Sequence, residues 1–516
     1  MLQPQLEEFS GTERFLVQCQ LGTGTFGLVY QVYDRENNSV IALKKLRNSI
    51  YQQNSEALYR FKQEFRALAD VIHPNLVTLY ELIFDDDKWF FTMELVDGVN
   101  FIDHIYGKKE NSNRALSTHK TIQQTTGDTP TVTATSASNI AIPTLPEELK
   151  TTSSSLTDKQ SFNPPLIIRL RAALHQLAEG IYALHKAGKL HRDLKPSNVL
   201  VTATGRVVIL DFGLVIEHSV ENLEVDLVGT PTHMSPEQAA GQPITPASDW
   251  YSFGVILYQA LTGQLPFFGK LFDVLSKKQV LDPIAPDKIA ENVPPDLSEL
   301  CMELLRRDPT TRPHGEEVLL WLQNKPISGL SGYIPTKKAI FVGRENLLVT
   351  LEQAFLGTKT GRANIAYVSG ISGIGKTSLV KHFLAQLRQK DSTTLTFSGR
   401  CYEQESMPYK VFDSLIDSLA QYLKHLPEFE LIKLLPEGFL ALTRLFPVLK
   451  SVTSQYAHKP LDIPDNQELR RRAFTALREL LVTLAKKNPI VISIDDLQWG
   501  DKDSAALLQE VFSPPN

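Results

Sequence analysis

Cysteine is scarce in this sequence, and its few copies are widely separated. Three cysteines occur among 516 residues, at Cys19, Cys301 and Cys401, and no two of them form a C-x-x-C pair. This spacing argues against a disulfide framework and against a zinc site. Because free thiols persist in a reducing compartment, we expect a cytoplasmic protein.

Long apolar runs and a strong net charge are also missing. No uninterrupted apolar stretch reaches the roughly 18 residues of a membrane span, and the first residues, MLQPQLEEFSG, are too polar and acidic for a secretory signal. The net charge is −5, so no strongly basic surface is available for nucleic acid. We therefore expect no nucleic-acid partner and no membrane span.

The composition that is present, 42% hydrophobic and 22% charged, predicts a globular protein, and the length of 516 residues predicts several domains. We expect residues 1–13 to form a tail and residues 14–325 to form the first domain. Its early part, to about residue 105, has the alternating apolar and polar residues of strands, with one helical segment among them. Its later part, from residue 164, is mostly helical. Between them, residues 106–163 are rich in serine and threonine without an apolar period, which predicts a disordered insert.

A second change of composition predicts another domain. The sequence NKPISGLSGYIPTKKA contains a linker at residues 326–339, and residues 340–516 follow as a separate unit. In this unit, NIAYVSG, a helix from Lys376 and TLTFSGR predict a strand–helix–strand arrangement, and PIVISIDDL predicts a further apolar strand.

A glycine-rich motif, G-x-G-x-x-G, lies at Gly22, Gly24 and Gly27. Such a run occurs in the first turn of dinucleotide-binding domains, in hairpins that cover a nucleotide, and in ordinary surface hairpins. In the first setting a helix begins within the glycines, because its N-terminus holds the pyrophosphate. Here the β-branched and aromatic sequence LVYQVYD follows, which predicts a second antiparallel strand and favours the nucleotide-covering hairpin.

Lys44 lies in the apolar strand sequence VIALKKL, 17 residues after Gly27. An unpaired buried charge is costly, so this lysine needs a partner unless it points outward from an edge strand. Glu64, on the following helical segment, is the natural partner. An ion pair between them would hold Lys44 against the α- and β-phosphates of a nucleotide.

The sequence KLHRDLKPSNVLV has the residues needed for phosphoryl transfer. Asp193 lies five residues before Asn198, and it can accept or orient the proton of an incoming hydroxyl, while Asn198 can bind Mg²⁺ through its amide oxygen. Lys195 can neutralise the transferred phosphoryl group. Asp211 follows the apolar sequence VVIL, where its carboxylate can chelate Mg²⁺ that bridges the phosphates.

Residues 14–325, without the insert, resemble a eukaryotic-type serine/threonine protein kinase. The sequence HRDLKPSN matches the H-R-D-L-x-x-x-N motif of that family, and Ser235-Pro236-Glu237 stands where the family has A-P-E. By the same resemblance, Asp249 holds the catalytic-loop backbone and Arg312 pairs with Glu237. The resemblance implies an α+β bilobal fold, with ATP between a small β-rich lobe and a larger helical lobe.

The resemblance also implies how ATP and the acceptor bind. Lys195, together with Thr230, is similar to the pattern of serine/threonine kinases, so the expected acceptors are serine and threonine hydroxyls of protein substrates. Met93 is expected to face the adenine pocket. The residues expected to bind ATP are Leu21, Gly22, Gly24, Gly27, Val29, Ala42, Lys44 and the backbone of Glu94 and Val96.

A second nucleotide site is predicted by GISGIGKTSL, which reads G-x-x-x-x-G-K-T at Gly370, Gly375, Lys376 and Thr377. It follows an expected strand and opens an expected helix, the context typical of a P-loop. Backbone N–H groups would surround the β-phosphate, Lys376 would reach the β- and γ-phosphates, and Thr377 would bind Mg²⁺.

Two acidic residues follow the apolar strand VISI. Asp495 is the expected Walker B aspartate, whereas Asp496 is a candidate for polarising the attacking water or belongs to a solvated acidic turn. Together with FVGRE, GRCYEQE and DDLQWGD, these motifs resemble the AAA-like ATPases of signalling proteins, in a P-loop α/β fold. Such ATPases have further strands and a helical lid, so we expect a C-terminally incomplete domain and the N-terminal part of a larger bacterial signalling protein. The resemblance also implies oligomerisation through this domain and downstream signalling modules.

Two functions remain open at this point. In the first, a serine/threonine kinase is gated by the attached ATPase; in the second, the P-loop domain is a nucleotide-switched scaffold and phosphotransfer is minor. Two regulatory features are also open. An acidic residue of the segment after Asp211, near the candidate phosphorylation sites Ser219, Thr230 and Thr232, either replaces an activating phosphate or is simply solvated. The insert is either autophosphorylated or a passive linker.

Overall fold

The computed structural model describes residues 9–24, 27–47, 55–107, 164–211, 231–323, 343–358, 361, 363–452 and 465–512. The expected linker and nearly all of the expected insert lie outside these ranges, as do Ser219 and Thr230. Among the helices of the described ranges, none is both long enough and apolar enough to cross a membrane.

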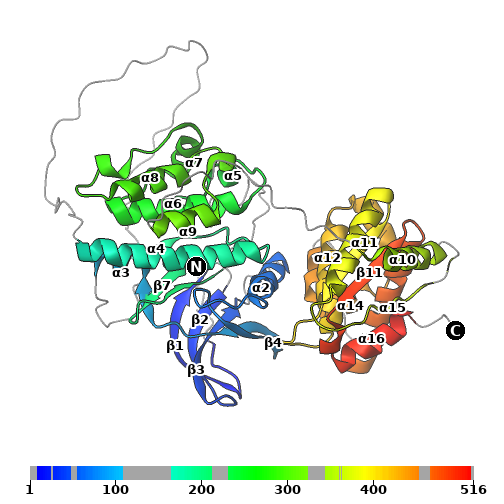
Figure 1. Ribbon diagram of the computed structural model, residues 1–516. Coiled ribbons are helices and arrows are strands. Elements are labelled where there is room, and N and C mark those ends of the chain that lie inside the picture. The colour runs from blue at the N-terminus through cyan, green and yellow to red at the C-terminus, as the bar shows by residue number, and fades with distance from the viewer. Residues whose placement is uncertain are drawn as a thin grey trace, which may run out of the picture.

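An antiparallel sheet forms the first part of the chain (Figure 1), with strands in the order β1-β2-β3-β5-β4. The strands predicted for LVYQVYD and VIALKKL are both present. One face of the sheet buries Val32, Leu43 and Phe90, and the other packs Leu82 and Phe91 against helix α2. The elements are β1 (Phe15–Thr23), β2 (Gly27–Asp34), β3 (Ser39–Leu46), α2 (Ser55–Leu68), β4 (Leu79–Asp85) and β5 (Lys88–Met93).

A larger helical part follows, and a small three-stranded sheet, β6-β7-β8, lies at its border with the first part (Figure 1). Helix α4 buries an apolar stripe that includes Leu174 and Ile181, and α6 is buried along almost its whole length around Trp250. The elements are β6 (Gly98–Asn100), α3 (Phe101–Tyr106), α4 (Pro164–Lys186), β7 (Val199–Thr202), β8 (Val207–Ile209), α5 (Pro236–Ala239), α6 (Pro246–Thr262), α7 (Leu271–Val280), α8 (Pro295–Leu304) and α9 (Gly315–Leu322). The expected arrangement of a β-rich lobe followed by a helical lobe is confirmed.

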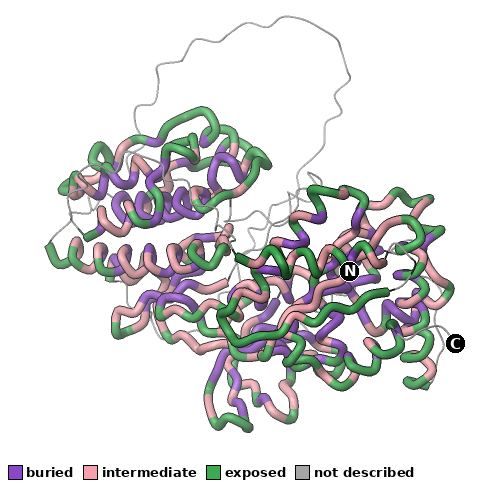
Figure 2. Tube along the Cα trace, turned by 45° about the vertical axis from the view of Figure 1, so that its right-hand side comes forward, coloured by how far each residue is buried: buried purple, intermediate pink, exposed green. Residues whose placement is uncertain are grey.

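The C-terminal part has its own apolar core, and Figure 2 shows buried residues running through the interior of both parts. Its strands β9 and β11 pair in parallel, with helices around them. The elements are α10 (Glu345–Thr358), α11 (Lys376–Lys390), β9 (Leu395–Arg400), β10 (Glu405–Ser406), α12 (Lys410–Lys424), α13 (Glu428–Leu434), α14 (Phe439–Leu445), α15 (Asn466–Ala485), β11 (Ile490–Asp495) and α16 (Lys502–Phe512).

One predicted strand of this part is wrong. Residues 363–370, which contain NIAYVSG, form no strand, and Ile365 and Tyr367 are 63% and 82% exposed. The apolar pattern reports which side chains a strand would bury, but a strand also needs a neighbouring edge for its backbone hydrogen bonds. In the described chain, β11 and β9 pair only with each other, and residues 363–370 pair with neither of them.

The two parts share one sheet. Strand β10 pairs in parallel with β4, with Glu405 opposite Leu82 and Ser406 opposite Ile83. The sheet of the first part therefore ends in a strand that the C-terminal part contributes, in the order β1-β2-β3-β5-β4-β10. Figure 1 shows the C-terminal part beside β4 and α2.

Candidate active site

A buried lysine connects three elements at the centre of the first part. The ammonium of Lys44, in β3, donates hydrogen bonds to Glu64 Oε1 on α2 at 2.5 Å and to Asp211 Oδ1 after β8 at 2.8 Å. Burial opposes the charge of Lys44, but the two carboxylates outweigh burial and raise its pKa. Burial and the carboxylate of Asp211 raise the pKa of Glu64 to about 7 against the attraction of Lys44. The strand lysine therefore does not point outward into solvent.

The loop between α4 and β7 carries the expected site residues Asp193, Lys195 and Asn198. Lys195 Nζ donates to Asp193 Oδ2 at 2.8 Å, and Asn198 Nδ2 donates to the Asp193 carbonyl at 2.9 Å. The Asn198 carbonyl in turn accepts from the Leu210 amide at 2.8 Å, directly before Asp211. The hairpin of β7 and β8 thus fixes this loop next to Asp211, which brings the candidate proton acceptor Asp193 and both candidate Mg²⁺ ligands into one region.

A buried aspartate of helix α6 holds the loop in place. Asp249 accepts from the amides of Arg192 and His191 at 2.8 and 2.9 Å and contacts His185 Nε2 at 2.8 Å. Although burial opposes ionisation, His185 and these donors lower the pKa of Asp249. Arg192 has a φ of 69°, a left-handed conformation that the two amide hydrogen bonds stabilise just before Asp193. Sequence reasoning assigned this role to Asp249 but missed His185, the second-last residue of α4.

The donor set at Asn198 and Asp211 fits a magnesium ion. One amide oxygen and one carboxylate are hard ligands of the kind that Mg²⁺ takes in small number beside phosphate oxygens. Burial opposes ionisation of Asp211, but Lys44 outweighs it and lowers the pKa of this carboxyl. Asp211 is therefore an anion over the physiological pH range and is able to bind a cation.

The glycine hairpin lies over the lysine. Gly24 donates to the Gly27 carbonyl at 2.8 Å, and a Cβ on Gly27 would lie 2.6 Å from the Lys45 carbonyl oxygen and 3.3 Å from Lys44 Cγ. Only glycine allows β2 to approach β3 so closely at this point. Gly22 is different, because a Cβ there would meet no atom within 4 Å.

The expected adenine residues surround the end of β5 and the segment after it. Val29 is opposite Lys44 in the β2–β3 pairing, and Ala42 is opposite Met93 in the β3–β5 pairing. The amide of Glu94 donates to the Thr78 carbonyl at 2.8 Å, which leaves its carbonyl oxygen as the group to offer to a base. Val96 and Leu21 are half-buried. A small pocket next to these residues is lined by Glu64, Leu68, Val77, Leu79, Phe91, Met93 and Asp211.

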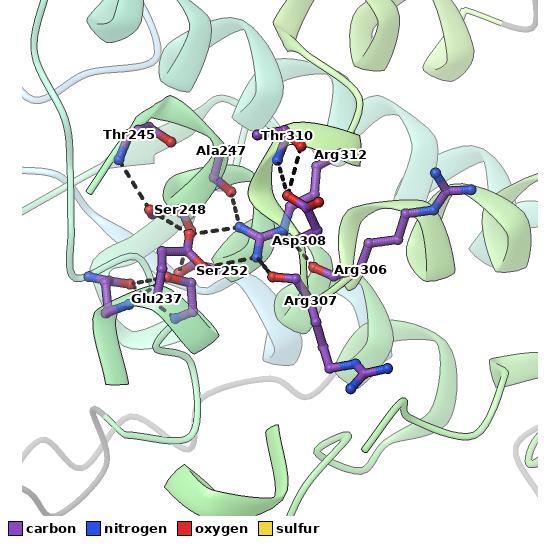
Figure 3. A network of polar contacts seen from close by, with 12 residues as sticks. Glu237, Thr245, Ala247, Ser248, Ser252, Arg306, Arg307, Asp308, Thr310 and Arg312 are labelled. Carbon is purple, nitrogen blue, oxygen red and sulfur yellow. Dashed lines mark hydrogen bonds and ion pairs between the residues drawn. The ribbon is translucent and has the colours of Figure 1, made fainter. Parts of the chain in front are cut away.

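A buried ion pair joins α5 to the segment before α9 (Figure 3). Arg312 donates to both carboxylate oxygens of Glu237, at 2.8 and 2.9 Å, and also to the Ala247 carbonyl. Ser248 donates to Glu237 as well, at 2.7 Å. The pairing of Glu237 with Arg312, inferred from the sequence, is confirmed.

A buried lysine that sequence reasoning missed organises the segment before α5. Lys278, on α7, donates to the carbonyls of Pro231 and Met234, each at 2.6 Å. Thr232 lies between them, whereas the acidic residues that precede Thr230 lie outside the described ranges. A lysine in the amphipathic pattern of α7 gives no indication of such a role.

The second site is built around the turn before α11. Gly373 and Gly375 have φ values of 78° and 93°, and Lys376 donates to the carbonyl of Gly370 at 2.8 Å. Thr377 Oγ1 donates to Asp495 Oδ2 at 2.8 Å, which joins the start of α11 to the end of β11. A threonine hydroxyl and an aspartate side by side are suited to Mg²⁺ at a nucleotide phosphate.

Asp496 is hydrogen-bonded rather than simply solvated. Its Oδ2 accepts from Arg400 Nε at 2.9 Å, and its Oδ1 accepts from Gln498 at 3.0 Å. Sequence reasoning missed Arg400, although this arginine belongs to GRCYEQE, one of the motifs that carried the resemblance. Arg344, also missed, donates to the carbonyl of Ile374 in the P-loop.

Two family matches cover most of the chain. Residues 15–127 and 145–321 match the family described as "Protein kinase domain". Residues 340–515 match the family described as "AAA ATPase domain". The residues between β1 and α9 that form the first site fall in the first match, and the P-loop, Asp495 and Asp496 fall in the second.

Several curated proteins are similar to the chain. Serine/threonine-protein kinase PknD of Chlamydia felis is 28% identical over 58% of this chain and 30% of its own length. PknD of Chlamydia pneumoniae is 29% identical over 63% and 33%. Serine/threonine-protein kinase pkn2 of Myxococcus xanthus is 31% identical over 62% and 33%. The matched region spans about a third of the length of these relatives.

Proposed function

Because this chain belongs to the protein kinase family, we propose that residues 14–325 transfer the γ-phosphoryl group of ATP to serine and threonine hydroxyls of proteins. The observation that carries the proposal is the convergence of Lys44, Glu64 and Asp211 beside the loop of Asp193 and Asn198. The names of the relatives and Lys195 support serine or threonine as the acceptor.

The proposed mechanism assigns each group one task. The oxygen of the substrate hydroxyl bonds to the γ-phosphorus while the bond from this phosphorus to the leaving ADP breaks. Asp193 takes up the proton that the hydroxyl loses. Lys195 neutralises the transferred group, and Lys44, held by Glu64, orients the α- and β-phosphates. Asn198 and Asp211 would hold Mg²⁺, which supplies charge neutralisation at the phosphates when it is bound.

The C-terminal part is proposed to bind a second ATP as a switch domain. The hydrogen bond between Thr377 and Asp495, together with the left-handed glycines before Lys376, supports nucleotide binding there. The same P-loop site would also serve the alternative function, in which the C-terminal part is a nucleotide-switched scaffold and phosphotransfer is minor. A cytoplasmic location, oligomerisation through the switch domain and downstream signalling modules belong to the same proposal.

The experiment that tests this function is transfer of radiolabelled phosphate from ATP to casein by the full chain. Wild type is expected to label serine and threonine, and Asp193→Asn to lower the rate by roughly a hundredfold or more. Lys376→Ala leaves the first site complete, so it separates the two functions. Wild type that labels no more than Asp193→Asn would refute the kinase, and a signalling output that survives Asp193→Asn but not Lys376→Ala would favour the scaffold.

A further inference from the structure

The outer face of helix α2 is bound by the C-terminal part through a cluster of charges. Lys62 donates to Asp413 at 2.7 Å and to Asp417 at 2.8 Å, both on α12. Arg66, one turn further along α2, donates to the same two aspartates and to Glu405 at 2.6 Å. Basic residues spaced i, i+4 on one helix therefore meet acidic residues spaced i, i+4 on the other.

These charges are buried, which determines what the cluster contributes. Lys62 and Asp417 are each 1% exposed, and Arg66 is 3% exposed. Removing charges from water offsets most of their mutual attraction, so such a cluster adds little net stability but strongly disfavours any misaligned contact. It fixes the register of α12 against α2 and, because its charges regain hydration on separation, allows the contact to open.

Backbone and apolar contacts extend this interface. The Leu82 amide of β4 donates to the Gln404 carbonyl at 2.8 Å, next to the parallel pairing of β10. Met407 is buried in the same apolar cluster as Phe61 and Phe65 of α2. The C-terminal part therefore contacts both α2 and strand β4 of the first part. A movement of the C-terminal part must move α2 and β4 with it.

Glu64 lies on the other face of α2. It is two residues from both Lys62 and Arg66, which places it about 200° around the helix from Lys62. Its carboxylate contacts Lys44 while the charges at 62 and 66 contact α12. A helix held on one face in this way cannot tilt or turn without moving Glu64 relative to Lys44.

One arginine reaches from the P-loop site to the end of α2. Arg400 Nε donates to Asp496 at 2.9 Å, and its Nη1 donates to Asp70, two residues after the last residue of the helix. Asp496 directly follows Asp495, whose carboxylate binds Thr377 of the P-loop. A single guanidinium is thus shared between an acid of the second nucleotide site and an acid just after α2.

We propose that residues 340–516 act as an intramolecular clamp on α2 and that Arg400 transmits the nucleotide state of the P-loop to the Lys44–Glu64 pair. The proposal rests on the kinase function above. When Asp496 turns to accept a hydrogen bond from the attacking water beside the γ-phosphate of a bound ATP, it competes less for Arg400, which then binds Asp70 more fully. ATP at the P-loop therefore tightens the clamp and raises phosphotransfer at the distant cleft.

A double-mutant cycle in the full chain tests the role of Arg400 as a positioning residue. Arg400→Ala and Lys376→Ala are each expected to lower kcat/KM for casein phosphorylation by about fivefold, and the double variant to fall no further. The matched control is Arg388→Ala, an exposed arginine of α11 whose guanidinium contacts Thr396 within the same part, and it should retain wild-type activity. Additive losses in the double variant would overturn the transmission by Arg400.

Hydrogen exchange tests the clamp without depending on phosphotransfer. In an Asp193→Asn background, Lys62→Glu is expected to speed exchange of the α2 amides at least tenfold, and adding Asp417→Lys to restore part of the protection. Unchanged exchange in Lys62→Glu would overturn the clamp. Faster exchange, combined with a wild-type chain that phosphorylates nothing, would leave the clamp standing and refute the kinase instead.

Discussion

Lys44 Nζ lies 2.5 Å from Glu64 Oε1, so that β3 and α2 are joined by one buried ion pair directly beside Asp211. The pair places an ammonium where nucleotide phosphates are expected, and it connects the cleft to a helix whose opposite face is held by the C-terminal part.

Lys44→Met should lower kcat/KM for phosphotransfer by roughly a hundredfold or more, because a preorganised cation is lost at the phosphates. Glu64→Gln should have a smaller effect, since Lys44 keeps its contact with Asp211. Steady-state kinetics with both variants at saturating casein check this order. An activity of Lys44→Met within a few-fold of wild type would contradict the assigned role.

Gly27→Ala should raise the KM for ATP, because its Cβ would lie 2.6 Å from the Lys45 carbonyl and force β2 away from β3. Gly22→Ala is the matched comparison, since open space surrounds that position. Its effect on KM should be clearly smaller. Equal effects of the two alanines would show that the close approach of the strands at Gly27 does not shape the nucleotide site.

Arg312→Met should destabilise the kinase part by about 3–5 kcal/mol, because it leaves the Glu237 carboxylate buried without its cation. The double variant Arg312→Met, Glu237→Gln removes both charges and should recover part of that loss. Calorimetric unfolding, in which the transition of the kinase part is followed separately, measures both values. If the double variant is as unstable as Arg312→Met, the unpaired charge of Glu237 is not the cause of the destabilisation.

Stability should fall at mildly acidic pH through His233. Burial, with a contribution from Lys278, lowers the pKa of His233 to about 4 from its ordinary 6.5. Between these values the unfolded chain binds the proton and the folded chain does not, so the stability present above about pH 6.5 is lost as the pH falls toward 4. From pH 7 to 5 the loss from this group is about 2 kcal/mol.

The variant His233→Gln isolates this effect. Between pH 7 and 5, the unfolding free energy should fall less for the variant than for wild type. The difference between the two falls should be about 2 kcal/mol, the loss attributed to His233. Calorimetry of the kinase transition at the two pH values provides the comparison. Identical falls in the two proteins would mean that the His233 side chain is as easily protonated in the folded chain as in the unfolded one.

Much of the first part could be predicted from sequence because its constraints are local. Period-two patterns gave the strands around Gly27 and Lys44, since each strand buries one set of alternating side chains. The pairing of Lys44 with Glu64 followed from the cost of an unpaired buried ammonium, and that of Glu237 with Arg312 followed from the family resemblance. Both pairs are formed.

The contacts between the two parts could not be predicted in this way. Lys62 and Arg66 read as an ordinary solvated face of an amphipathic helix, as do Asp413 and Asp417, and only the fold brings the two faces together. Strand β10 has two residues, too few for a period. The wrong strand at residues 363–370 shows a related limit, because the apolar pattern was present there but the backbone pairing with a neighbouring strand was not.

The most direct test of the central claim is a crystal structure of Lys376→Ala with Mg²⁺ and a non-hydrolysable ATP analogue, so that one nucleotide site remains. The account predicts that Asn198 and Asp211 ligate Mg²⁺ on the triphosphate, with Lys44 at the α- and β-phosphates and Asp193 facing the acceptor position. An analogue bound elsewhere, or bound with these four side chains directed away from it, would contradict the account.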